Sequence, residues 1–201
     1  MNITLEKQVP VTRVTEDVII VPWFQGQTMA CITLSTDAQK IIESLCMTKE
    51  FSGRHMETAV VRLARPRLMR IVFVGLGKKE TFTCDALSRA MGAGIMRVKK
   101  MHALSVAVMI PDGVVRDVLA ARITHAVVFG IRQANYTFLK YKTKKKDETQ
   151  SVSRCTIMLE HAPSAEEKAA VKHATILADS MELAKDIGNT DSVDLTPASF
   201  A

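Results

Sequence analysis

The stretch Met69-Arg-Ile-Val-Phe-Val-Gly-Leu-Gly77 decides the fold class, because a buried strand here runs into two glycines. A helix is predicted to begin near Thr83, since apolar residues recur at helical spacing from Leu87 to Met101. The same alternation extends to both ends of the chain. Further strands are predicted over 3–9, 17–24, 58–63, 104–110 and 152–159, and further helices near 36, over 114–133 and from 164. The apolar seam of the last helix is predicted at Ala170, Ala174, Leu177, Met181 and Ala184. We therefore expect an α/β fold, with a mixed, mostly parallel sheet flanked by helices on both faces.

The composition is that of an ordinary globular protein and excludes several classes. The chain has 201 residues, a net charge of +6, 47% apolar and 24% charged residues, so a globally disordered chain is excluded. It has no apolar run long enough to span a membrane and no signal-peptide pattern at its start. The four cysteines form no C-x-x-C pair, which argues against a zinc ribbon or a redox dithiol. We expect a cytoplasmic protein with reduced thiols.

The sequence contains no complete catalytic motif. Gly75-Leu76-Gly77 fails the dinucleotide and the P-loop patterns, because both would need glycine where Glu80 stands. We interpret it as a tight structural turn, with a phosphate-binding loop as the alternative. None of the five histidines belongs to a metal-binding motif, and His125, in an apolar helix, is expected in the core.

The excess positive charge is concentrated in one short run. Five lysines lie within seven residues, at Lys140, Lys142, Lys144, Lys145 and Lys146. Such a run is typical of a solvated loop. The alternative is a patch that contacts the phosphates of a nucleic acid, and these five lysines are its candidate contacts.

Four stretches, taken together, resemble one known family. They are Phe51–Arg54, Val72–Lys79, Ala134–Lys145 and the end of the chain from Ala184 to Pro197. In order and spacing they are similar to the N-terminal domain of the leucine aminopeptidases, also called cytosol aminopeptidases. The positions that match the family's motifs are Gly53, Gly75, Gly77, Asn135, Tyr136, Phe138, Tyr141, Lys142, Asn189, Leu195, Thr196 and Pro197. The sequence departs from the family's pattern at Arg54, Lys185, Asp191 and Val193.

The resemblance implies a macro-domain-like fold over residues 1–187, and a linker over 188–201 that leads toward a catalytic domain. It also implies a hexameric metallopeptidase that releases N-terminal amino acids with two divalent metals, zinc or manganese. The family's metal ligands and catalytic residues follow the linker, so no position here is assigned as catalytic or as a metal ligand. Asn189-Thr190-Asp191 resembles the start of a metal-binding motif, but its register places it in the linker. We expect this chain alone to hold no cofactor and to be inactive.

Three functions follow as hypotheses. The first is a non-catalytic domain that serves assembly of a leucyl aminopeptidase, either as the front of a longer enzyme or encoded alone. Its partners would be the catalytic domain or homologous aminopeptidase subunits, met by an exposed apolar patch on the helix of residues 170–184. The alternatives are a stand-alone nucleic-acid-binding module that uses the lysine run, or a macro-like module that binds a nucleotide or ADP-ribose at Gly75–Gly77.

Overall fold

The computed structural model describes residues 1–26, 36–63, 69–110, 119–142 and 151–196. Six strands form one sheet in the order β1-β6-β5-β2-β4-β3. β3 pairs antiparallel with β4, and every other neighbouring pair is parallel. The strands are β1 Asn2–Lys7, β2 Val18–Phe24, β3 Thr58–Leu63, β4 Met69–Gly77, β5 Ser105–Ile110 and β6 Arg154–Leu159. The predicted mixed, mostly parallel sheet is confirmed.

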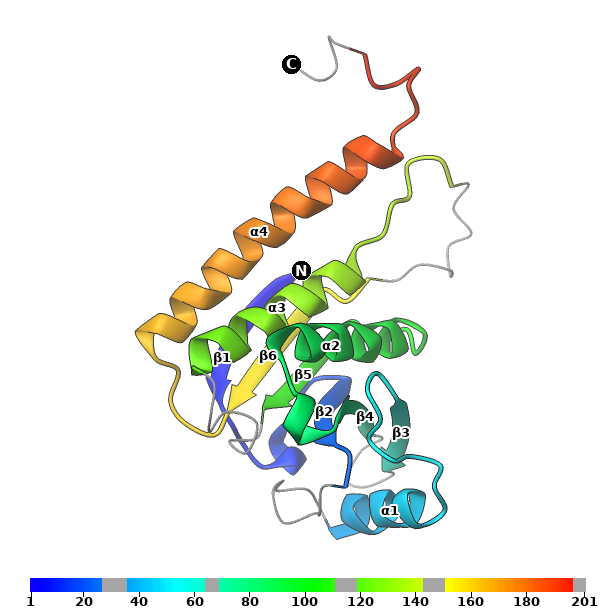
Figure 1. Ribbon diagram of the computed structural model, residues 1–201, viewed down its shortest axis with the longest axis vertical. Helices are drawn as coiled ribbons and strands as arrows, with labels where there is room; N and C mark the ends of the chain where they lie inside the picture. Colours follow the sequence, from blue (N-terminus) through cyan, green and yellow to red (C-terminus); the bar gives the residue numbers. More distant parts are fainter. Residues whose placement is uncertain (27–35, 64–68, 111–118, 143–150, 197–201) are drawn as a thin grey trace.

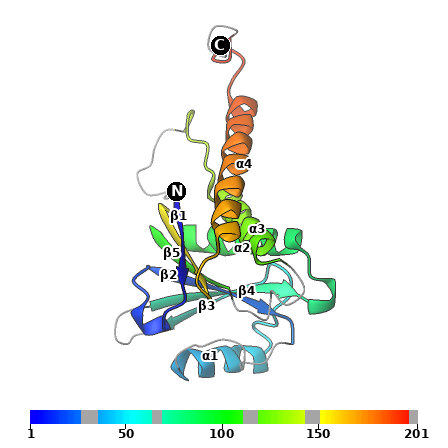
Figure 2. The same cartoon turned by 90° about the vertical axis from the view of Figure 1, so that its left-hand side faces the viewer.

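Helices cover both faces of this sheet, as predicted (Figures 1 and 2). α1 (Thr36–Met47) lies on one face, while α2 (Cys84–Lys99) and α3 (Ala120–Asn135) lie on the other. α4 (Ala165–Asn189) packs on α3, and its C-terminal half extends beyond the body of the domain. Short 3-10 turns at Val11–Arg13 and Lys79–Thr81 complete the described elements.

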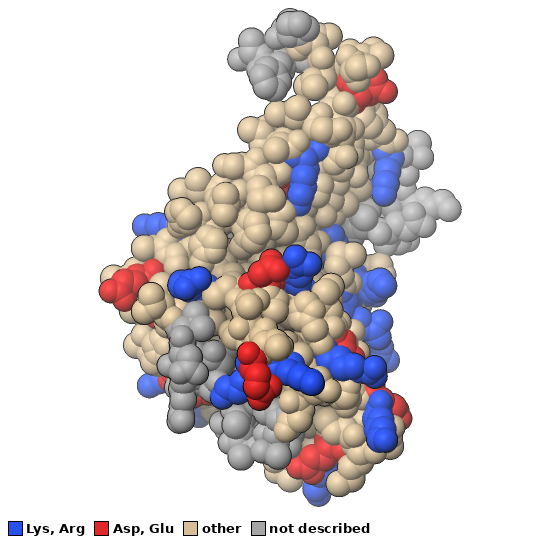
Figure 3. Space-filling view, viewed as in Figure 1, with Lys and Arg blue, Asp and Glu red and all other residues tan. Residues whose placement is uncertain are grey.

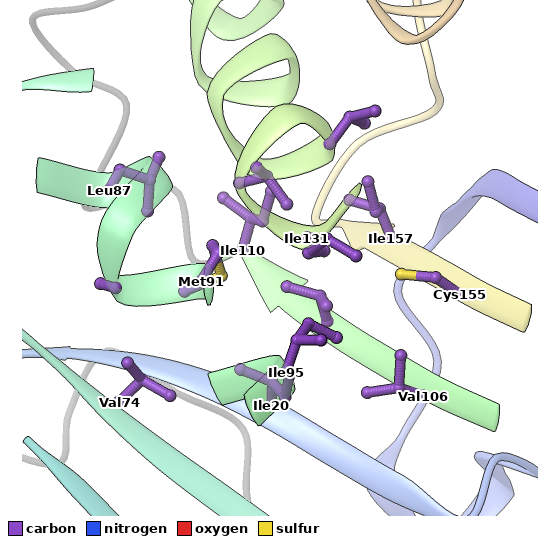
Figure 4. Packing of buried hydrophobic residues seen from close by; sticks show 14 of the residues in the cluster. Ile20, Val74, Leu87, Met91, Ile95, Val106, Ile110, Ile131, Cys155 and Ile157 are labelled. Atoms are coloured by element: carbon purple, nitrogen blue, oxygen red, sulfur yellow. The ribbon is translucent and has the colours of Figure 1, made fainter. Parts of the chain in front are cut away.

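Two apolar cores, one on each face, hold the layers together. The larger core joins the sheet to α2 and α3 and includes Ile20, Ile95 and Ile131 (Figure 4). The smaller core lies beneath α1 and includes Ile42 and Phe73. Strands β2 and β5 are buried along their whole length, as expected for parallel strands covered on both faces.

Local signals place the starts of two helices where the sequence predicts them. The Thr83 hydroxyl accepts a hydrogen bond from the Ala86 amide at 3.1 Å. Ser164 and Glu167 form the predicted capping box, with the Glu167 amide donating to the Ser164 Oγ and the Ser164 amide donating to the Glu167 carboxylate.

Three predicted features differ in the structure. Gly75-Leu76-Gly77 is the last part of β4 and not a separate tight turn, because its backbone keeps pairing with neighbouring segments. The helix predicted over 114–133 begins at Ala120 and ends at Asn135, and the first part of the predicted range, 114–118, lies outside the described residues. α4 continues to Asn189, two residues past the predicted end of the domain at residue 187. The division into a domain and a linker stays a prediction.

Candidate interdomain surface

The two glycine motifs meet in space and form a backbone joint. The Gly75 amide donates to the Glu57 carbonyl at 2.8 Å, and the Gly77 amide donates to the Gly53 carbonyl at 3.0 Å. A Cβ at Gly75 would lie 1.9 Å from the Arg54 carbonyl oxygen, so no larger residue fits there. Gly53 and Gly77 have φ values of +77° and +79°, which favour glycine. The amides that a phosphate would need are already used, so this part of β4 does not support the ligand-binding alternative.

The Glu57 carboxylate stabilises the same joint, and this role was not predicted from the sequence. Its carboxylate accepts hydrogen bonds from the Ser52 amide and hydroxyl and from the Arg54 amide, at 2.9–3.0 Å. Partial burial alone would raise the pKa of this carboxyl, but these hydrogen bonds outweigh burial and lower the pKa. The available signal was a single acidic residue directly after the glycine turn.

The segment after α3 is anchored at its start by Asn135 and Lys99. The Asn135 side chain exchanges two hydrogen bonds with the backbone of Val152, both at 2.9 Å. The Lys99 ammonium donates to the Thr137 hydroxyl at 2.8 Å and to carbonyl oxygens at the end of α3. Burial lowers the pKa of Lys99. Lys99 was not predicted, although a cation at the end of one helix is a common partner for the carbonyls of another.

The same segment then forms hydrogen bonds with the end of α4 and with the chain that follows it. The Tyr136 hydroxyl donates to Asp186 at 2.7 Å and accepts from Asn189 at 3.2 Å. The Tyr141 hydroxyl donates to Asp194 at 2.8 Å and accepts from the Asp191 amide at 2.8 Å. We call these contacts, with the ion pair described next, the tyrosine clamp. Two motif stretches about fifty residues apart in the chain are thereby held side by side.

Lys140 belongs to the clamp and does not stand as a free cation. Its ammonium lies 3.1 Å from the Asp194 carboxylate and 5.5 Å from the centre of the Tyr141 ring. The hydrogen bond to Asp194 raises the pKa of Lys140, and the hydrogen bond from Tyr141 lowers the pKa of Asp194. Lys142 is exposed, whereas Lys144, Lys145 and Lys146 lie outside the described residues. The described part of the lysine run therefore adds no support for a nucleic-acid partner.

The remaining motif positions lie around the clamp. Phe138 packs edge-on against Tyr141, with ring centres 5.7 Å apart. The Leu195 amide donates to the Asp191 carbonyl at 2.9 Å, so the chain turns directly after α4. Thr196 is exposed, and Pro197 lies outside the described residues. Asp191 thus takes part in a turn, as the linker interpretation expects.

The C-terminal half of α4 directs its charged side chains inward. Arg132 of α3 binds both Asp179 and Glu182 of α4, and the Lys185 ammonium donates to the side chain of Gln133. Lys185 also lies 5.0 Å from the centre of the Tyr136 ring. The seam between α3 and this half of α4 is therefore polar.

The opposite side of the same half is apolar and exposed. Ile176 is 66% and Leu183 61% exposed, and Leu177 and Met181 are also largely exposed. The small residues Ser180, Ala184 and Gly188 lie between them and are exposed as well. Figure 3 shows the surface over the protruding half of α4 as mostly uncharged. We call this surface the α4 outer face, and it confirms the predicted apolar patch on the helix of residues 170–184.

The described ranges contain no group of three or more His, Cys, Asp or Glu side chains that could hold a metal ion. Within the same part of the chain, no helix is both long and apolar enough to cross a bilayer.

Comparison with known proteins agrees with this arrangement of motifs. The family model of the cytosol aminopeptidase family, N-terminal domain, matches residues 20–145. A probable cytosol aminopeptidase of Paraburkholderia phymatum is 24% identical over 184 residues, which are 90% of this chain and 37% of that protein. One from Alkaliphilus metalliredigens is 26% identical over 172 residues, or 84% and 34% of the two chains. The present chain belongs to the cytosol aminopeptidase family and corresponds to its N-terminal domain.

Solved structures share the fold at low sequence identity. A mutant of tomato leucine aminopeptidase superposes with a TM-score of 0.76 at 17% identity, over 100% of this chain and 40% of that one. The bottromycin maturation enzyme BotP, solved in complex with manganese, superposes with a TM-score of 0.68 at 19% identity, over 92% and 34%. The chain thus spans a little over a third of the relatives that it matches.

Proposed function

We propose that this chain serves the assembly of a leucyl aminopeptidase by docking the enzyme's catalytic part on the α4 outer face. The observation that carries the proposal is the reversed polarity of the C-terminal half of α4, where Asp179 and Glu182 bind Arg132 of α3 while the largest apolar side chains face solvent. An isolated domain gains nothing from this arrangement, because exposed apolar area lowers its solubility. When a partner covers the helix, burial of the same apolar side chains stabilises the complex.

Burying the exposed apolar side chains of the α4 outer face would release enough free energy to support docking. Fully burying one Leu, Ile or Met side chain stabilises by about 1.5–3 kcal/mol. Four such side chains on the α4 outer face are between 39% and 66% exposed, so covering them contributes on the order of 3–6 kcal/mol. The small residues at positions 180, 184 and 188 recur every four positions, which lets a partner helix approach closely.

The tyrosine clamp supports the same role. It ties Asp191 and Asp194 to the body of the domain, so the chain leaves α4 in a set direction. A partner that follows in the same polypeptide would start from a fixed point beside the α4 outer face. The cost of ordering that connection is then lower.

Peptide hydrolysis and its metals belong, in this proposal, to the catalytic part. BotP was solved with manganese, and the family resemblance implies two divalent ions, zinc or manganese. The described residues of this chain do not fit such a centre, because they gather no group of three metal-binding side chains. We therefore assign no catalytic step to this chain. We propose that the assembled enzyme is a hexamer.

The test joins this chain to an aminopeptidase catalytic part. Residues 1–201 replace the matching segment of the Paraburkholderia phymatum relative, and assembly is followed by light scattering and hydrolysis of leucyl-p-nitroanilide. We expect the chimera to assemble, and Ile176→Glu with Leu183→Glu to abolish assembly. Met47→Glu is the matched control, because Met47 is 83% exposed on α1, away from the α4 outer face.

Two results would refute the proposal. Assembly and activity that survive the double substitution would show that the α4 outer face is not the docking surface. Metal-dependent hydrolysis by the purified 201-residue chain would show that the domain is itself catalytic. Circular dichroism of the variants excludes simple unfolding as a cause of lost assembly.

A further inference from the structure

A concave surface lies at the N-terminal end of α4, before the α4 outer face begins. It is a hollow of about 520 Å³ where the first turns of α2, α3 and α4 meet. Its volume is within the range of about 300–1,000 Å³ that small-molecule sites occupy. The hollow is lined by Cys84, Ala121, Arg122, His125, Ala126, Glu166, Ala169, Ala170 and His173.

Alanines and imidazoles form the interior of this hollow. The four alanines make its walls small and apolar, which is why the helices leave room between them. The rings of His125 and His173 come from α3 and α4, with centres 5.3 Å apart. His125 also lies nearly parallel to the Phe129 ring, at 6.2 Å and 15°. The expectation that His125 is a core residue is therefore wrong, since it is half-buried and borders a cavity.

The surroundings of the His125 ring favour its uncharged form. Burial lowers its pKa, and the neighbouring His173 lowers it further. The charged groups that share the hollow with the two imidazoles are Arg122 on α3 and Glu166 on α4, and the Cys84 thiol on α2 is the remaining titratable group. A neutral imidazole offers a flat aromatic surface together with one donor and one acceptor.

Arg122 and Glu166 supply opposite charges at one apolar hollow. Both side chains line it, and within the described part of the chain neither forms an ion pair or a hydrogen bond. A ligand that brings a carboxylate and an ammonium group would pair with both at once. An apolar side chain on that ligand would fill the alanine-lined space between the imidazoles and the rim.

We propose that this hollow binds a free amino acid with an apolar or aromatic side chain. A metal ion fits less well, because the described residues bring no three His, Cys, Asp or Glu side chains close enough together to hold one. Aminopeptidases release such amino acids, so any role in sensing product rests on the proposed function. The binding itself does not, because it uses the first three turns of α4, which precede the docking surface along the helix.

The test titrates the full 201-residue chain with leucine and with phenylalanine. For a ligand of this size we expect a dissociation constant of about 1 mM, so the titration extends to about 20 mM. The NMR signals of the His125 and His173 rings report occupancy of the hollow. Leucinamide lacks the carboxylate and 4-methylpentanoate lacks the ammonium group, and both should bind at least tenfold more weakly.

Two substitutions and two controls complete the design. Arg122→Gln and Glu166→Gln each remove one charge and should weaken leucine binding roughly tenfold or more. Arg97→Gln and Lys168→Gln change exposed charges on α2 and α4 that do not line the hollow, and should leave binding unchanged. Thermal unfolding confirms that each variant is folded.

Several results would overturn the proposal. The proposal is wrong if the His125 and His173 signals do not shift at any point of the titration. It is also wrong if leucine binding is unchanged in both charge variants. Tight binding of Zn²⁺, added alone, without any response to leucine would assign the hollow to a metal instead. None of these outcomes depends on whether the α4 outer face docks a catalytic domain.

Discussion

Arg132 joins α3 to α4, and replacing it with methionine would measure how strongly the two helices are held together. The Arg132 side chain is only 10% exposed. Its Nε and Nη2 atoms donate to the two carboxylate oxygens of Glu182 at 3.2 and 3.1 Å, and Nη2 also binds Asp179. Methionine keeps an unbranched stem of similar helix propensity and removes only the guanidinium group.

The expected cost follows from the exposure of the partners. Removing one member of a fully buried ion pair costs about 3–5 kcal/mol, because the remaining charge is left uncompensated. Here Glu182 is 27% and Asp179 is 58% exposed, so water compensates part of the loss. We therefore expect Arg132→Met to lower the free energy of unfolding by about 2 kcal/mol.

Arg89 on α2 provides a matched control within the same chain. It pairs with Asp85 one helical turn away at 2.9 Å, but the two side chains are 66% and 71% exposed. Exposed pairs of this kind contribute about 0.5 kcal/mol or less. In urea denaturation, a slope near 2 kcal/mol/M places the midpoint of Arg132→Met about 1 M lower, and that of Arg89→Met within about 0.25 M of the wild type. Equal midpoint shifts in the two variants would refute the reasoning.

Three further predictions test other parts of the structure. Gly130→Ala should lower the melting temperature by several degrees, because its Cβ would lie 2.1 Å from a backbone oxygen of α2, whereas Gly92→Ala has room at 3.6 Å and should stabilise by up to about 1 kcal/mol. Tyr141→Phe removes the acceptor of the Asp191 amide, so hydrogen exchange at that amide should quicken roughly 2- to 12-fold. The folded state lowers the pKa of His125, so the unfolded chain binds the proton more readily, and stability should fall as the pH drops below about 6.5. Melting curves of His125→Gln between about pH 7.5 and 5 should show a weaker dependence.

Most of the fold could be predicted because the local signals and the sheet agree. Residues 71–77 and 106–110 are continuous apolar runs within β4 and β5, which is what a strand covered on both faces requires. Thr83 and Ser164 carry capping chemistry that fixes where α2 and α4 begin. The strand order was not predictable, since residues 2–7 and 154–159 pair at one edge of the sheet although most of the chain separates them.

The candidate site was predictable only in part. The family motifs mark the right residues, but nothing in their spacing shows that Tyr136 and Tyr141 reach the end of α4. The lysine run predicted a solvated loop, with a phosphate-contacting patch as the alternative, whereas the turn after α4 brings Asp194 to Lys140. Lys99 and Glu57 were missed because each acts on backbone groups, and a sequence does not show which backbone groups lie nearby.

The sequence identifies the apolar stripe of α4 but does not show which of its residues the domain itself buries. Spacing predicted an inner seam at Ala170, Ala174, Leu177, Met181 and Ala184, and the structure buries Ala174 but exposes Leu177, Met181 and Ala184. The last turns of α3 are polar, so they attract the charged side of α4 and turn the stripe outward. Helical periodicity identifies a surface that will be covered, but it does not say by what. In the C-terminal half of α4 the covering surface is not α3, and the stripe itself is therefore an argument for a partner.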